Sequence, residues 1–383
     1  MSPKAPFGSS VRSFSPEQIS SLVDCLLRRG YEVNAPTVRD GAIVYDRIAS
    51  GNELPTGWTD EQQAGKYQLK KRQDGALFGY SVGPHSWKKF LFPSVSCVWA
   101  AQTVDGHFRV MTGEPEYVSR AFLGVRACEL HALAIQDKVF LENAYVDSGY
   151  KTRRENALIV AVNCTQAGGT CFCDSMGTGP RVSFGYDILL TEIFPDGEHL
   201  LLADAATPTG NEILAEISSQ PATREQIAAA TAAVDTAASH MGRTMPTSGL
   251  KELLYRNVEN PRWDVLAERC LSCANCTLVC PTCFCSTIED CTDLAGQQAE
   301  RIRKWDSCFT TDFSYIHGGS VRATPRSKFR QWMMHKLAYW NDQFGTSGCT
   351  GCGRCITWCP VGIDITEEVR AIRDSEATAS ISL

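Results

Sequence analysis

Two cysteine-rich runs with identical spacing constrain the fold of this 383-residue chain more than any other feature. Each run reads C-x2-C-x2-C-x3-C-P, which places four thiols within eleven residues. The first run contains Cys270, Cys273, Cys276 and Cys280, and the second contains Cys349, Cys352, Cys355 and Cys359. Any fold of this chain must therefore accommodate eight thiols that come from two distant parts of the sequence.

This spacing is typical of bacterial ferredoxins that bind two [4Fe–4S] clusters. Three thiolates on a tight loop can bind three corners of one cubane, whereas the fourth faces away and binds the other cluster. The first cluster is therefore predicted to be bound by Cys270, Cys273, Cys276 and Cys359, and the second by Cys349, Cys352, Cys355 and Cys280. Zinc is the alternative metal, although zinc sites usually use two separated cysteine pairs.

The crossed assignment requires the 68 residues between Cys280 and Cys349 to leave the second cluster and return to it. Two stretches within them, "TDLAGQQAERIRKW" and "SKFRQWMMHKLAYWNDQFG", have the composition and spacing of helices. We therefore predict that residues 241–383 form an all-helical two-cluster ferredoxin domain with a long helical insert.

Residues 1–240 have the pattern of a mixed α/β domain. The apolar runs 121–126 and 156–163 are typical of buried strands, and residues 128–144 between them have helical spacing. A strand, a helix and a strand in succession indicate two parallel strands joined by a crossover helix. The domain boundary is predicted near residue 240, after an alanine-rich helix.

Four more cysteines belong to no standard motif but follow the predicted parallel strands. Cys128 and Cys164 each lie just past the carboxyl end of a strand, where neighbouring strands of an open α/β sheet form ligand-binding crevices. Cys171 and Cys173 follow on the glycine-rich loop "TQAGGTCFCDSMGTGP". We predict that these four residues bind a third [4Fe–4S] cluster. A zinc site with the same ligands and a set of buried free thiols are the alternatives.

The chain has eighteen cysteines in total, and the remaining six have less specific interpretations. Cys25 and Cys97 stand alone in the sequence and are expected to be small buried apolar residues. The other four could pack around the clusters or help to form a further site, and they are Cys283, Cys285, Cys291 and Cys308. Because a reducing cytosol does not sustain structural disulfides, so many thiols indicate metal binding or thiol chemistry.

Composition excludes several classes of function. A formal net charge of -6 gives no basic surface for nucleic acid or for an anionic membrane. No apolar run approaches the roughly 18 residues of a membrane-spanning helix, and the N-terminus lacks the apolar core of a signal peptide. We expect a cytoplasmic protein. Neither G-x-G-x-x-G after a strand nor a Walker loop is present, so no catalytic residue and no substrate-converting site are predicted.

Several segments resemble the beta subunit of cytoplasmic sulfhydrogenases, which are NAD(P)-linked [NiFe]-hydrogenases. The resemblance is carried by "VGPHSWKKFLFP" at 82–93, "GVRACELHAL" at 124–133, residues 153–180 and "RCLSCANCTLVCPTCFC". The electron-transfer subunit of anaerobic sulfite reductases is similar as well. The resemblance implies an iron–sulfur electron relay between a flavin subunit that handles NAD(P)H and the small subunit of a [NiFe]-hydrogenase with its large subunit. It also supports the third cluster.

Two alternative functions remain open at this point. The first is an electron-transfer subunit of an anaerobic sulfite or sulfur reductase, which would have the same cluster chemistry but sulfite reductase subunits as partners. The second, from another class, is a protein whose iron–sulfur clusters are purely structural. The duplicated motif favours electron transfer, because it suits short-range transfer between two centres.

Overall fold

A mixed eight-stranded sheet organises the N-terminal part of the chain in the computed structural model, which describes residues 11–112 and 117–381. The strand order is β12-β1-β11-β10-β9-β8-β2-β3, and the four central strands β10, β9, β8 and β2 run parallel. The strands are β1 (Arg12–Phe14), β2 (Glu32–Arg39), β3 (Ala42–Arg47), β8 (Arg120–Val125), β9 (Ala157–Val162), β10 (Ile188–Ile193), β11 (Leu200–Ala205) and β12 (Gln220–Pro221).

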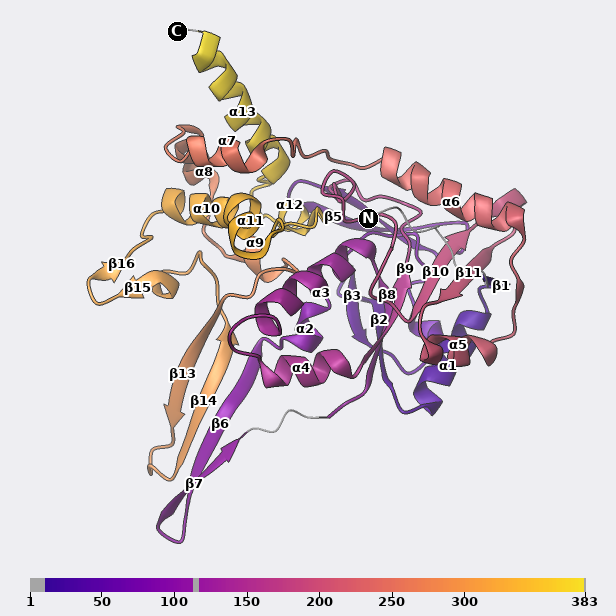
Figure 1. Cartoon of the computed structure of the whole chain (residues 1–383), viewed down its shortest axis with the longest axis horizontal. Helices are drawn as coiled ribbons and strands as arrows, with labels where there is room; N and C mark the ends of the chain where they lie inside the picture. Colours follow the sequence, from indigo (N-terminus) through magenta and orange to yellow (C-terminus); the bar gives the residue numbers. More distant parts are fainter. Residues whose placement is uncertain (1–10, 113–116, 382–383) are drawn as a thin grey trace.

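Helices cover both faces of this sheet (Figure 1), which explains why β9 is wholly apolar and β8 is apolar after Arg120. On β9, Leu158, Val160 and Val162 face a core that includes residues of α1 and α5, whereas Ile159 and Ala161 face a core that includes residues of α3 and α4. These helices are α1 (Gln18–Arg28), α3 (Ala127–Phe140), α4 (Ser148–Glu155) and α5 (Pro208–Ala215). The predicted strand–helix–strand unit is thus confirmed as β8, α3 and β9, with α4 inserted before β9.

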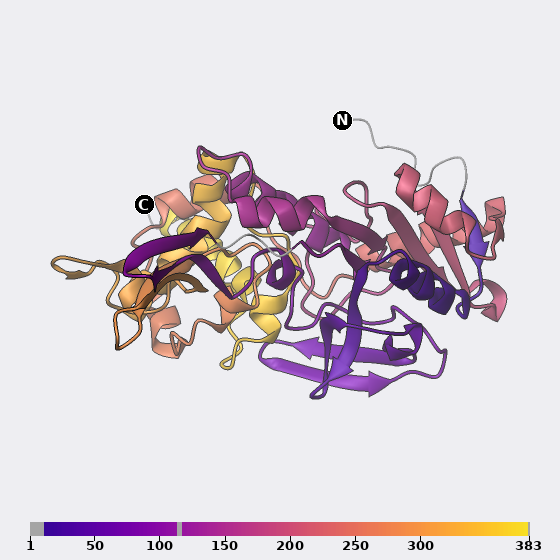
Figure 2. The ribbon, with the colours of Figure 1, turned by 90° about the horizontal axis from the view of Figure 1, so that it is seen from below.

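The C-terminal part is a group of mostly short helices around a separate apolar core. That core includes Trp263, Trp332, Met333, Leu337 and Ile356, all of them buried. Figure 2 shows these helices at one end of the molecule and the large sheet at the other. The helices are α7 (Leu250–Arg256), α8 (Arg262–Arg269), α9 (Asn275–Leu278), α10 (Pro325–Met334), a π-helical turn (His335–Tyr339), α11 (Trp340–Phe344), α12 (Arg354–Thr357) and α13 (Ile365–Ile381).

The prediction of an all-helical ferredoxin domain with a helical insert is wrong for the first half of the insert. That half forms β13 (Ser286–Thr292) and β14 (Gln298–Trp305), which pair with β6 (Val95–Val104) and β7 (His107–Thr112) in the order β13-β14-β6-β7. All three pairings are antiparallel, and the four strands project from the body of the molecule (Figure 1). Pairing with a distant strand has overridden the helical propensity of "QAERIRKW". The second stretch predicted to be helical, residues 327–345, is helical from α10 to α11.

The two parts of the chain are joined by a β-sheet to which both contribute strands, as well as by the linker between α6 (Arg224–Ser239) and α7. β6 belongs to the N-terminal part and β14 to the C-terminal part, yet they are hydrogen-bonded neighbours in one sheet. The boundary near residue 240 stays a prediction. Within residues 11–112 and 117–381, no helix is both long enough and apolar enough to cross a membrane.

Candidate iron–sulfur centres

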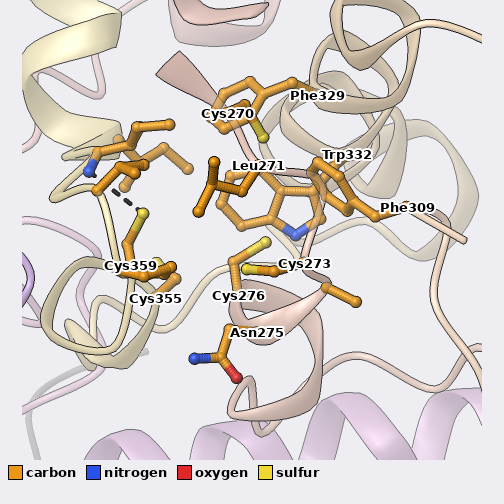
Figure 3. Close-up of a pocket in the computed structure, with 15 residues that line it drawn as sticks. Cys270, Leu271, Cys273, Asn275, Cys276, Phe309, Phe329, Trp332, Cys355 and Cys359 are labelled. Carbon is orange, nitrogen blue, oxygen red and sulfur yellow. Dashed lines mark hydrogen bonds between the residues drawn. The ribbon is translucent and has the colours of Figure 1, made fainter.

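The first group of thiols lines a cavity between α8, α9 and the segment after α12. Cys270, Cys273 and Cys276 come from the first run and Cys359 from the second (Figure 3). Three aromatic side chains of the C-terminal core, Phe309, Phe329 and Trp332, close the inner side of the cavity. Cys273 is exposed, and so is Leu271, at 64% of its surface, so this group lies at the surface of the protein.

Both runs wrap their thiols with the same backbone conformation. Ser272 and Ala274 in the first run have φ of 52° and 66°, and Gly351 and Gly353 at the equivalent positions have φ of 65° and 75°. These left-handed residues turn main-chain N–H groups inward, so that the N–H of Ser272 donates to Cys270 Sγ (3.4 Å) and that of Gly351 to Cys349 Sγ (3.4 Å). Such N–H groups suit an anionic cluster.

The second group of thiols is deeply buried. Cys349 and Cys352 are each 8% exposed, as is Cys280 from the first run, and Cys280 interacts electrostatically with Cys349, Cys352 and Cys355. Cys359 interacts in the same way with Cys270 and Cys276. The fourth cysteine of each run thus lies with the first three of the other. Burial raises the pKa of Cys349 to about 12, whereas a hydrogen bond with Cys283 and the nearby Lys336 lower the pKa of Cys280.

The third group forms where β8 and β9 end. Cys128 opens α3, Cys164 follows β9, and Cys171 and Cys173 lie on the loop that follows. Cys128 and Cys173 are both 5% exposed and share a buried cluster with Val82 and with Cys352 of the second group. Cys128 and Cys173 also interact electrostatically with Cys164. The structure therefore brings the four cysteines together, next to the second group.

Glycines leave room beside these thiols. A Cβ atom at Gly168 would lie 3.1 Å from Cys171 Sγ, and one at Gly179 would lie 3.1 Å from Cys173 Sγ. A cysteine set cradled by glycines has the donor chemistry that an iron–sulfur cluster requires. Across the part of the chain that is described, no set of three or more His, Cys, Asp or Glu side chains is arranged to hold a single metal ion.

Buried cations accompany the thiols, and the sequence patterns did not identify them. Lys336 Nζ lies 3.1 Å from Cys280 Sγ, and Arg126 Nη1 lies 3.8 Å from Cys164 Sγ. Arg354, between two cysteines of the second run, forms a fully buried ion pair with Glu129 of α3. In the sequence, the only indication of a buried role for Lys336 is its position among the apolar residues of the helical stripe 332–340. The partners of the two arginines come from distant segments.

The other cysteines divide into buried neighbours and surface residues. The Cys283 thiol lies 3.7 Å from Lys336 Nζ and forms a hydrogen bond with Cys280. Cys308 donates a hydrogen bond that lowers the pKa of Cys285 to about 7, and both line a pocket beside His335. Cys291 is exposed on β13. Cys25 is buried as expected, but Cys97 is exposed on β6, so the prediction of a buried Cys97 is wrong.

Two comparisons with known proteins bear on the clusters of the C-terminal part and on the family of the chain. Residues 269–363 match the family of 4Fe-4S dicluster domains, which supports two [4Fe–4S] clusters in the C-terminal part. The chain is 33% identical over 276 residues to sulfhydrogenase 2 subunit beta of Pyrococcus furiosus, a match that covers 70% of this chain and 80% of that protein. An iron–sulfur electron-transfer subunit fits both findings. The chain belongs to the sulfhydrogenase subunit beta family.

Proposed function

We propose that this chain is the electron-relay subunit of a cytoplasmic [NiFe]-hydrogenase complex. It would pass single electrons between a flavin subunit that handles NAD(P)H and the small subunit of the hydrogenase. The similarity to sulfhydrogenase 2 subunit beta supports membership of a complex with several subunits. We propose no substrate-converting site in this chain, so its activity depends on partners that supply and remove electrons.

The proposed ligands are the three groups of cysteines described above. The first cluster is assigned to Cys270, Cys273, Cys276 and Cys359, and the second to Cys280, Cys349, Cys352 and Cys355. The third is assigned to Cys128, Cys164, Cys171 and Cys173. Bound [4Fe–4S] clusters would supply one-electron redox chemistry. The protein holds them, shields the inner ones from water and fixes their order.

The observation that carries this proposal is the continuity of the three groups. Cys352 belongs to the second group and packs with Cys128 and Cys173 of the third. Cys355 of the second group interacts electrostatically with Cys276 of the first, and lines the same cavity. The thiols therefore form one path from the end of the large sheet to the exposed Cys273. Clusters with a purely structural role would not need such contiguity.

Anaerobic purification of the full chain, alone and with its partners, tests the proposal. The isolated chain should contain about eight irons from the two runs, or about twelve with the third cluster, and should be reduced and reoxidised reversibly. It should neither evolve hydrogen nor oxidise NAD(P)H by itself. Co-purifying [NiFe]-hydrogenase subunits would support the hydrogenase complex, whereas sulfite reductase subunits would support the alternative. Bound iron that no reductant can alter would contradict electron transfer.

A further inference from the structure

A buried lysine, Lys336, is hydrogen-bonded to a thiol of the second group. Lys336 is 5% exposed and lies on the π-helical turn between α10 and α11. Its main-chain oxygen accepts hydrogen bonds from the N–H of Gly348 (2.8 Å) and the hydroxyl of Ser347 (3.3 Å). The residue is therefore fixed against the start of the second run. Single π-helical turns within α-helices occur frequently at functional sites.

The contacts of Lys336 Nζ are those of an ammonium group. Nζ lies 3.1 Å from Cys280 Sγ, 3.0 Å from Thr282 Oγ1 and 3.1 Å from the main-chain oxygen of Gly348. A lysine ammonium has three N–H donors, which matches these three acceptors, and the sulfur of Cys283 lies further from Nζ, at 3.7 Å. Lys336 also interacts electrostatically with Cys349, so its positive charge faces two of the proposed ligands of the second cluster.

The thiols of the first group are bonded differently. They accept hydrogen bonds from main-chain N–H groups, those of Ser272 to Cys270 Sγ (3.4 Å) and Ile363 to Cys359 Sγ (3.3 Å). Within residues 11–112 and 117–381, no lysine or arginine hydrogen-bonds to a thiol of this group. Within the described residues, the second copy of the motif therefore differs from the first by a buried ammonium group that is hydrogen-bonded to a ligand sulfur, whereas the buried Arg354 beside Cys352 is already paired with Glu129.

We propose that Lys336 sets the reduction potential of the second cluster above that of the first. This inference rests on the proposed electron-relay function. A cluster gains negative charge on reduction, and a nearby buried cation stabilises that charge strongly because water screens it little. Electrons that enter the chain then collect at the buried second cluster, and each one leaves through the exposed first cluster only when a partner draws it.

Redox titration of the anaerobic full chain, followed by EPR, tests this proposal. The signal of the second cluster is identified by its change in Cys355→Ser. In Lys336→Met, the ratio of reduced to oxidised second cluster at a fixed potential should fall about tenfold, which corresponds to about 59 mV for one electron. Lys336→Arg should shift the ratio less than threefold. The control is Lys328→Met. Lys328 lies on α10 and is buried like Lys336, but it bonds to no cysteine in the described structure.

Three results would overturn the proposal. The first is a shift below threefold in Lys336→Met, and the second is an equal shift in Lys328→Met. The third is a wild-type second cluster that titrates at or below the first. If the Lys336→Met protein loses iron, Lys336→Gln is titrated instead, because its amide can still donate hydrogen bonds but has no charge. The order of the two reduction potentials in the wild type tests the proposal in either case. A chain without reversible [4Fe–4S] signals would instead refute the relay function itself.

Discussion

At the scale of single residues, the exchange of the fourth cysteine between the two runs is the central feature of the candidate centres. Cys359 lines the same cavity as Cys270, Cys273 and Cys276, although 82 residues separate Cys276 from Cys359 in the sequence. The equivalent residue of the first run, Cys280, is buried among thiols of the second. The proposed clusters therefore depend on ligands from both runs, and neither run can complete a centre alone.

Replacing Cys359 by Ser should damage the first cluster rather than the second. The expected result is loss or conversion of the EPR signal that depends on Cys270, with the other signal retained. Cys291→Ser is a matched control, because Cys291 is exposed on β13. The iron content of the Cys291→Ser protein should be unchanged. Loss of the second signal in Cys359→Ser would show that each run serves its own cluster.

Replacing Cys171 by Ser tests the third cluster. If Cys128, Cys164, Cys171 and Cys173 bind [4Fe–4S], the iron content should fall by about four atoms per chain, and one EPR component should disappear or change. Cys25→Ser removes a buried thiol far from the proposed ligands in the sequence and should leave the iron content unchanged. Equal iron and identical spectra in Cys171→Ser and the wild type would reject the third site.

The cysteines could be predicted from the sequence because the spacing of a cluster motif is itself a local geometric requirement. Lys336 could not be assigned a role in the same way. Its acceptors at Cys280, Thr282 and Gly348 lie between 12 and 56 residues away, and only the folded insert brings them together. A buried charge of this kind depends on contacts that local sequence patterns do not encode.

At the scale of elements, the loop that carries Cys171 and Cys173 packs directly on the second run. The N–H of Phe172 donates to the main-chain oxygen of Gly351 (2.8 Å), and Thr178 Oγ1 donates to that of Thr350 (2.6 Å). A Cβ atom at Gly351 would lie 2.6 Å from the Cα atom of Cys173. This contact explains why the second run has glycine where the first has Ser272.

Gly351→Ala should therefore separate the third group from the second. The substitution adds a clash with main-chain atoms to the cost of a left-handed alanine, so we expect a loss of roughly 3 kcal/mol in the free energy of unfolding. Urea denaturation and iron content measure the effect. Gly345→Ala is the control, because Gly345 has φ of 68° but nothing within 4 Å of the added Cβ. Its cost should be roughly 1 kcal/mol, and equal effects would contradict the packing argument.

The elements of the large sheet were easier to predict than those of the insert. Runs such as "ALIVAV" are buried on both faces, and no other environment accommodates them well. The segment 298–305 is different, because its alanine, glutamate, arginine and lysine residues favour a helix in isolation. Its strand conformation comes from pairing with β6, about 200 residues earlier in the chain, together with β13. The sequence contains no local signal for that pairing.

At the scale of the whole molecule, a buried ion pair fastens the two parts of the chain to each other. The side chains of Arg354 and Glu129 are 0% and 1% exposed. Arg354 also donates to the main-chain oxygens of Gly83 (2.8 Å) and His85 (2.7 Å), both in the N-terminal part. This pair lies beside Cys352 and Cys128, so it holds the second and third groups together.

Arg354→Met should destabilise the protein by roughly 3–5 kcal/mol, because it leaves the buried Glu129 carboxylate without its partner. The double variant Arg354→Met with Glu129→Met should recover part of that loss, since no uncompensated charge remains. Arg326→Met, which breaks exposed ion pairs with Glu259 and Asp264, should cost less than about 1 kcal/mol. Urea denaturation under anaerobic conditions compares the variants. A double variant no more stable than Arg354→Met would argue against this account.

The two copies of the cysteine motif differ in their exposure to solvent, so only one of them is open to a docking partner. The loop of Thr170 and Cys173 seals the second copy, whose glycines admit no side chain on that side. The first copy is more open, and its Leu271 and Cys273 face the solvent. A protein that docks there can approach a thiol ligand without moving any part of this chain. In the proposed relay, the second cluster would thus be shielded from dissolved oxidants, whereas a redox partner could reach the first cluster directly.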